Sequence, residues 1–388
     1  PEGIDILANI SPDIHHRKPH DHFSGDTYLP VDEAKYAAFV KAAVERYDGD
    51  GQDDMPGLKN PVKHWQVSNE PTKEPTNDST FADLQRITYQ AIKSACPDCV
   101  VLLGGVSGFP KRYIHGFDDV YKPILSKLNG KYVDVFDFHW YGEKREYALR
   151  DTDTGEDVFA HIRTTLTTAG FAPDLPLWIT EMGTYSGKPP SNPIMGAFPE
   201  QSEQEQARDL FKRHLYPLSR GVKKVFLAFG LIEGFISDDN YFNHTGLIYD
   251  GKDPGDLGIG VRKLAYYTYK KMTKMLDGSD WSTLVMLQDP TQDPHVFLGK
   301  VTKDSATRYV AWWDTFNVSG YKEGDTTTLS LDTLNGSKVV VTSVIPHSTL
   351  GKDVPTAGPT FSTKTESIVS HKTTITLGQD PVIVEVVK

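Results

Sequence analysis

Short apolar runs alternate with amphipathic segments over residues 1–278 of this 388-residue chain. Segment 36–47, for example, repeats its apolar side chains at helical spacing. Regular alternation of strands and helices is typical of parallel strands joined by crossover helices. We therefore expect a parallel α/β domain over residues 1–278. The strand-like runs in it are Ile4–Ile10, His64–Ser68, Val100–Gly104, Val133–His139, Leu177–Thr180 and Val222–Phe229.

Residues 279–388 have a different pattern. Short runs rich in Val and Thr are separated by Gly, Asp, Asn and Pro, and no helical periodicity interrupts them. Segments 296–301, 339–344 and 382–387 are examples. This pattern is typical of antiparallel strands in a two-sheet fold. We expect a C-terminal antiparallel β-sandwich domain over residues 279–388.

The net charge is −11, which argues against nucleic acid and anionic membranes as partners. No apolar run is long enough to span a bilayer. The charge instead fits an uncharged substrate such as a polysaccharide. Because the chain begins at Pro1 without a methionine, we expect a processed or cut product.

The two cysteines, Cys96 and Cys99, form a Cys-Pro-Asp-Cys sequence. Such a pair can be redox-active or can form half of a zinc site. A second pair that would complete a metal cage is missing from the sequence. We expect a helix-to-strand loop that holds two thiols, and no metal.

Two glutamates end strand-like runs. Glu70 follows His64–Ser68 within Asn69-Glu70-Pro71, and Glu181 follows Leu177–Thr180. In parallel α/β barrels, catalytic groups lie where strands end and the loops to the next helices begin. Two carboxyl groups that face each other across a pocket are what hydrolysis of a glycosidic bond needs. We expect Glu70 and Glu181 to be that pair.

A third strand-like run ends Asp137-Phe138-His139-Trp140-Tyr141. Alternation along a strand predicts that Asp137, His139 and Tyr141 share one face. If this face points inward, His139 and Tyr141 can donate hydrogen bonds to a carboxylate, and such bonds favour its charged form.

Together these residues resemble the retaining glycoside hydrolases of clan A, with families 39 and 5 as the nearest pattern. The resemblance covers residues 1–276 and rests on Asn69-Glu70-Pro71 and on Thr180-Glu181-Met182-Gly183. It implies a TIM-type (β/α)8 barrel followed by a β-sandwich, with no cofactor. It also implies a β-glycosidase, cellulase or xylanase that acts on plant-type poly- or oligosaccharides, either extracellular or at the cell surface.

The resemblance also implies roles for single residues. Glu70 would be the acid/base and Glu181 the nucleophile. Asn69 would bind the sugar 2-hydroxyl, and His139 and Tyr141 would position Glu181 and the substrate. The eighth strand of the clan commonly supplies a Trp platform, which this sequence lacks. Phe229 could replace that Trp as a sugar platform and Glu233 could bind hydroxyls, or the two could be a core aromatic and a surface carboxylate.

In that alignment Ile4–Ile10 is the third barrel strand. The chain would then supply strands 3 to 8 and lack the first two βα units. Such a barrel would expose open edges, which favour association. We expect a separate N-terminal segment or a homo-oligomer to complete it.

Two rival functions remain. Four histidines lie in the segment His15–His22, and with neighbouring aspartates they could bind a metal for a metal-dependent barrel hydrolase. Alternatively, an incomplete barrel could be a carbohydrate-binding protein without catalysis. The presence of both Glu70 and Glu181 favours hydrolysis.

Overall fold

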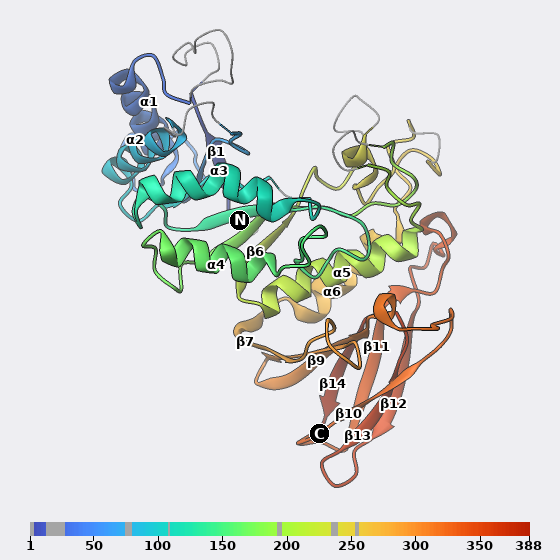
Figure 1. Ribbon diagram of the computed structural model, residues 1–388. Coiled ribbons are helices and arrows are strands. Elements are labelled where there is room, and N and C mark those ends of the chain that lie inside the picture. The colour runs from blue at the N-terminus through green and yellow to red at the C-terminus, as the bar shows by residue number, and fades with distance from the viewer. Residues whose placement is uncertain are drawn as a thin grey trace. The chain divides into compact units, whose positions relative to one another are not determined.

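The computed structural model divides the chain into two compact units, which are described separately (Figure 1). The first unit holds residues 1–140, 149–181 and 222–226, and the second holds the rest. The second unit thus takes in stretches that lie before residue 278, and the domain boundary at that residue stays a prediction. The described residues are 4–12, 28–73, 80–107, 109–191, 196–233, 240–252 and 256–388.

Six short strands form the centre of the first unit. The first three pair in the order β1-β2-β3, all parallel, and the others pair in the order β4-β5-β6. Parallel bridges from Leu102 to Val135 and from Val106 to Phe138 join the two sets. The strands therefore follow one another in space as in the sequence. They are β1 (Leu7–Ile10), β2 (His64–Val67), β3 (Val100–Leu102), β4 (Phe136–Trp140), β5 (Leu177–Met182) and β6 (Val222–Leu227).

Each of these strands matches a predicted run, and its apolar side chains account for the packing. All five residues of β4 are buried. Leu102, Val135 and Trp178 form a buried cluster, against which Phe226 packs. Burial on both faces is typical of parallel strands covered by helices. Within the described residues the strands do not close into a barrel, so the first unit is mixed α/β.

Four helices accompany the strands and contact one another in chain order, as the blue-to-green ribbons show (Figure 1). The helical spacing of segment 36–47 predicted α1, whereas the sequence did not indicate α3 and α4. α3 contains Gly116 and Pro123, and α4 carries four threonines. These residues disfavour helices in isolation, and tertiary packing outweighs them here. The helices are α1 (Glu33–Tyr47), α2 (Thr80–Ala95), α3 (Tyr113–Leu128) and α4 (Val158–Thr168).

The second unit contains two helices that pack on each other, α5 (Glu203–Ser219) and α6 (Leu264–Leu276). A capping box begins α5, because the Ser202 hydroxyl accepts a hydrogen bond from the Glu205 backbone while the Glu205 carboxylate accepts one from the Ser202 backbone. Of the helices in the described residues, none is long and apolar enough to cross a membrane.

Eight strands of the second unit are antiparallel neighbours in two sheets. One sheet has the order β12-β11-β14-β9-β8-β7 and the other pairs β10 with β13. Leu329 and Ile375 of the small sheet share a buried core with Tyr309 and Val341 of the large one. The two sheets thus enclose one core. The strands are β7 (Ser279–Gln288), β8 (Val296–Lys303), β9 (Ala306–Trp313), β10 (Thr327–Leu331), β11 (Lys338–Pro346), β12 (Phe361–Ser367), β13 (Thr373–Leu377) and β14 (Val382–Val387).

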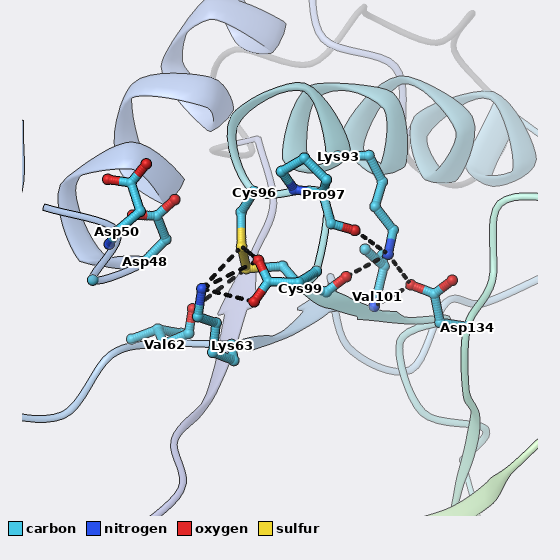
Figure 2. Close-up of a disulfide and its surroundings, with 12 residues drawn as sticks. Asp48, Asp50, Val62, Lys63, Lys93, Cys96, Pro97, Cys99, Val101 and Asp134 are labelled. Carbon is cyan, nitrogen blue, oxygen red and sulfur yellow. Dashed lines mark hydrogen bonds and ion pairs between the residues drawn. A yellow bond between two sulfur atoms is a disulfide. The ribbon is translucent and has the colours of Figure 1, made fainter. Parts of the chain in front are cut away.

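The expectation of two free thiols is wrong, because Cys96 and Cys99 form a disulfide between the end of α2 and the start of β3 (Figure 2). Both cysteines are buried. The Lys63 ammonium lies 3.6 Å from the Cys96 sulfur and pairs with Asp98 at 3.1 Å. A Cys-x-x-Cys spacing does not reveal from sequence alone whether the thiols are joined. Here the disulfide closes the turn between helix and strand.

Candidate active site

Glu70 sits on a tight turn that follows β2. The Ser68 amide donates to the Ile10 carbonyl at 2.9 Å, and the Glu70 amide donates to the Gly104 carbonyl at 2.8 Å. Both residues have left-handed backbones, with φ of 61° at Ser68 and 43° at Glu70. Such a conformation is costly for residues other than glycine and persists only where the surroundings impose it. The neighbouring strands therefore fix the position of Glu70.

Glu181 lies within β5, between the buried residues Thr180 and Met182. Its side chain keeps 27% of its surface exposed, and that of Glu70 keeps 35%. Glu181 is therefore held by a strand and Glu70 by the turn that follows one, and both carboxylates still reach the surface. We predicted that each of the two glutamates ends a strand. The observed positions are close to this prediction, since β5 extends only one residue beyond Glu181.

His139 of β4 lies between the two carboxylates. Its Nδ1 is 2.6 Å from Glu70 Oε1 and 3.4 Å from Glu181 Oε2. One carboxylate oxygen of Glu70 and one of Glu181 lie within 4.8 Å of each other. The imidazole itself is fully buried. An Nδ1–H group at this position can donate a hydrogen bond to Glu70 Oε1, the nearer of the two carboxylate oxygens. Two glutamates 111 residues apart (181 − 70) thus converge on one ring nitrogen.

Asp137 lies two residues before His139 on β4 and is fully buried. It accepts hydrogen bonds from the backbone amides of Leu103 at 2.9 Å and Gly104 at 3.1 Å, and from the Thr180 hydroxyl at 3.3 Å. Burial raises the pKa of Asp137 to about 6, against the opposing effect of the nearby His139. Asp137 thus links the ends of β3, β4 and β5, which carry or flank the site.

Gly105 is a site residue that sequence reasoning missed. Its φ is +67°, and a Cβ atom added there would lie 2.2 Å from His139 Nε2. The imidazole therefore packs directly on the glycine backbone, whose carbonyl accepts a hydrogen bond from the Tyr121 hydroxyl at 2.7 Å. The consecutive glycines Gly104-Gly105 just after β3 were an available signal, since glycine at a strand end often marks a close approach.

Asn69 is exposed, and its side-chain oxygen accepts a hydrogen bond from Gln66 Nε2 at 3.2 Å. Its predicted role at a sugar hydroxyl stays a prediction. The segment His15–His22, the basis of the metal hypothesis, lies outside the described residues. Among the described groups, Glu70, His139 and Glu181 have the donor atoms and spacing that a cation could use. Two of these three residues, Glu70 and Glu181, supply the pair of carboxyl groups that glycosidic hydrolysis needs.

Tyr141 and Phe229 belong to the second unit. Tyr141 is buried, and its ring centroid lies 6.2 Å from that of Phe229 and 5.1 Å from that of Phe242. Phe229 has a left-handed backbone with φ of 56° and is half-buried. The two residues therefore share one aromatic cluster, and their contact with substrate stays a prediction.

Glu233 is also in the second unit, and it is 5% exposed. Its carboxylate forms an ion pair with Lys263, whose ammonium also donates to the His244 carbonyl at 3.2 Å and lies 4.7 Å from the Tyr249 ring centroid. The interpretation of Glu233 as a surface carboxylate is wrong. Sequence could not reveal this, because the two partners are 30 residues apart.

The fold was compared with solved structures, and the similar structures named here belong to one class of enzyme. No family model and no curated protein matches the chain by sequence. The structural matches are glycoside hydrolases at low identity, and the resemblance seen in the sequence is thereby confirmed for the fold.

Three of these neighbours illustrate the match. A family 39 glycoside hydrolase from Bacteroides cellulosilyticus is 17% identical with a TM-score of 0.58, over 92% of this chain and 63% of that one. A GH30 endoxylanase from Clostridium papyrosolvens is 13% identical with a TM-score of 0.57, over 99% and 80%. A 4-O-α-L-rhamnosyl-β-D-glucuronidase from Fusarium oxysporum is 14% identical with a TM-score of 0.57, over 92% and 74%. The chain therefore spans 63% of the length of the Bacteroides enzyme.

Proposed function

We propose that this chain is a retaining glycoside hydrolase that cleaves β-glycosidic bonds of a plant-type poly- or oligosaccharide. One observation carries the proposal, namely the carboxylate oxygens of Glu70 and Glu181 within 4.8 Å of each other. Retaining enzymes hold their two carboxyl groups about 5–5.5 Å apart, whereas inverting enzymes need about 6.5–9.5 Å to admit a water. The short separation supports double displacement.

In the first step, Glu181 attacks the anomeric carbon and forms a glycosyl ester while Glu70 gives its proton to the departing oxygen. In the second step, Glu70 takes a proton from water, and the oxygen of that water displaces Glu181 from the anomeric carbon. Both carboxyl groups then return to their starting states. General acid–base help of this kind contributes about 10²–10⁴ in rate.

His139 supports this division of roles. Its ring contacts both carboxylates from a fully buried position and packs on Gly105. A donor held at this point orients both carboxylates without exposing itself to solvent. We assign His139 as a positioning residue, and Asn69 as the partner of the sugar 2-hydroxyl.

The wider setting agrees with a polysaccharide-degrading enzyme. The neighbours by fold include an endoxylanase and a glucuronidase, and a TIM-type barrel is the architecture that such a strand and helix order supports. The disulfide between Cys96 and Cys99 supports an extracellular or cell-surface location, because disulfides persist in oxidising compartments.

A mechanism-based label tests the proposal. An activated 2-fluoro glycoside, chosen by screening aryl β-glycosides, should form a stable adduct that peptide mass spectrometry places on Glu181. Glu181→Gln should prevent labelling, and Glu143→Gln should not. An adduct on another residue, or inversion of the product observed by NMR, would contradict the assignment. Glycan binding without turnover of any aryl glycoside would favour the non-catalytic alternative.

A further inference from the structure

A groove in the second unit stands apart from the residues discussed so far. It has a volume of about 400 Å³ and lies between α6 and segment 358–361. Volumes of this size are within the range of ligand sites in proteins, roughly 300–1,000 Å³. Tyr266 and Tyr267 of α6 and Phe361 of β12 provide aromatic surface in it. We call this feature the α6 groove.

Helix geometry explains how α6 builds the groove. Tyr267, Lys270, Lys271 and Lys274 follow one another at positions i, i+3, i+4 and i+7, so they form one face of the helix. The other face is buried, and from it the Thr268 hydroxyl donates to the Val344 carbonyl on β11 at 2.8 Å. The groove face is therefore presented from a fixed helix.

The groove is strongly cationic. Lys270 and Lys274 are exposed, and the Lys271 ammonium lies 4.9 Å from the Phe361 ring centroid. Arg262 lies over Tyr266 in the same way, also at 4.9 Å. Such cation–ring contacts hold the cations over the aromatic floor without neutralising their charge.

Counterions for these cations are scarce. The carboxylate whose negative charge raises the pKa of Lys271 is that of Glu385. This carboxylate already pairs with Arg308 at 3.0 Å. Burial and the neighbouring Lys274 both lower the pKa of Lys271, which marks a site where positive charges are crowded. Among the described residues, no ion pair to Arg262, Lys270, Lys271 or Lys274 is present. In a chain of net charge −11, this is a local excess of positive charge.

We propose that the α6 groove is a second carbohydrate site that binds acidic polysaccharide, with sugar rings stacked on its tyrosines and the anionic groups held by its lysines. Aromatic faces pack well against the apolar faces of sugar rings, and clustered cations attract polyanions. The choice of a sugar ligand rests on the proposed function. The anionic group is a uronate or a sulfate.

Nucleic acid and anionic lipid are less suited to the groove. Nucleic acid binding usually relies on basic surface that follows many phosphates, and the overall negative charge would repel such a long polyanion. A membrane would need a broad apolar face, whereas this groove has cations beside its three aromatic rings. Single-stranded DNA and phosphatidylserine vesicles therefore serve as competing probes.

Binding to the full chain, carrying Glu181→Gln to prevent turnover, is measured by titration calorimetry at low salt. The probes are short galacturonate oligomers, sulfated galactose oligomers and neutral xylose oligomers. We expect an acidic oligomer to bind, and Lys270→Glu with Lys274→Glu to weaken that binding about tenfold or more. Tyr267→Ala should also weaken it. Added salt should reduce affinity, because exposed charges are screened.

Lys338→Glu is the control, with the charge change of one of the two groove substitutions placed on exposed surface elsewhere. Lys338 pairs with Ser367, whereas Pro346 at the other end of β11 pairs with Phe361. This places the control substitution roughly 25 Å along the strand from the groove. The affinity of the Lys338→Glu variant for the acidic oligomer should therefore not change. Thermal melts verify that each variant is folded.

The outcomes separate the two proposals. Equal binding of neutral and acidic oligomers, unchanged affinity in the double variant, or tighter binding of DNA or vesicles would overturn the groove proposal, even in an active hydrolase. Conversely, the parent chain could lack glycosidase activity while acidic oligomers still bind in its α6 groove. That result would contradict the proposed function and support the groove proposal. Tighter binding of the galacturonate oligomer would identify the anionic group as a uronate, and tighter binding of the sulfated oligomer would identify it as a sulfate.

Discussion

Each unit gathers carboxylates around one basic side chain, and the two clusters differ in exposure. In the first unit, Glu70 and Glu181 flank His139 and keep 35% and 27% of their side-chain surface exposed. In the second unit, Asp209 pairs with Arg213 at 2.7 Å, and both side chains are almost fully buried.

Further hydrogen bonds hold the second cluster together. Arg213 donates to the Glu143 carbonyl at 2.9 Å, and the Glu143 amide donates to the Glu146 carboxylate at 2.8 Å. Burial, reinforced by the charge of Glu146, raises the pKa of Glu143 to about 7. This cluster is a structural ion network, and its groups are engaged by the protein itself.

The comparison teaches that proximity of carboxylates does not by itself define a catalytic site. In the first cluster His139 is buried and the two glutamates beside it are partly exposed. In the second cluster Arg213 and Asp209 are both buried. In the first, both carboxyl groups keep exposed surface, as the proposed function requires. Substitutions in each cluster should therefore affect different properties.

The largest expected effect is on catalysis. Glu181→Gln should lower kcat on an aryl β-glycoside by roughly 10⁴-fold or more, because in the proposed mechanism it removes the attacking atom of a coupled catalytic set. Steady-state kinetics measure it, and circular dichroism checks the fold. Glu143→Gln in the second cluster is the control and should retain kcat. Equal losses in both variants would show that the comparison between the clusters is mistaken.

Glu70→Ala should lower kcat/KM about 10²–10⁴-fold for substrates with poor leaving groups, because only these need a donated proton. Activated aryl glycosides should lose much less in the glycosylation step. A series of aryl leaving groups of graded acidity measures the difference. A loss that does not depend on the leaving group would argue against an acid role for Glu70.

Arg213→Met should cost about 3–5 kcal/mol in the free energy of unfolding, because it leaves the buried Asp209 without its cation. Urea unfolding measures the loss. The double variant Arg213→Met with Asp209→Asn should recover part of it, since the uncompensated charge is then removed. A single variant as stable as the parent chain would show that the second cluster is not a structural network.

The smallest effect concerns pH. The pKa of Glu143 is raised from 4.5 to about 7, so the folded chain binds this proton more tightly than the unfolded chain. Stability linked to Glu143 is therefore greatest at acid pH, falls by about 3 kcal/mol as pH rises from about 4.5 to about 7, and is constant above that. Glu143→Gln should flatten this part of the stability curve, measured by urea unfolding from pH 5 to 8. An unchanged slope would contradict a buried protonated Glu143.

Sequence predicted the parts of the site that lie on strands or just after them. Glu70 and Glu181 come at the ends of apolar runs, and in parallel α/β folds such ends meet at one edge, so their convergence was predicted; His139 was expected beside them if its face of the strand points inward. The helices α3 and α4 escaped prediction, because glycine, proline and threonine weaken the local signal that tertiary packing restores.

Other features depend on contacts that no local pattern encodes. Burial of Glu233 requires Lys263 to arrive from a later segment, and the contact of Gly105 with His139 requires β3 and β4 to lie side by side. Pairing of Cys96 with Cys99 depends on the turn that joins helix to strand. Such contacts follow from the assembled fold rather than from residue spacing.

The left-handed turn at Ser68 and Glu70 has a consequence for protein engineering. Its conformation is imposed by bonds to Ile10 and Gly104 on neighbouring strands. A peptide that contains Asn69-Glu70-Pro71 alone would relax to an ordinary backbone and turn the carboxylate elsewhere. Transplanting this motif into another scaffold would therefore require both flanking strands to be carried with it.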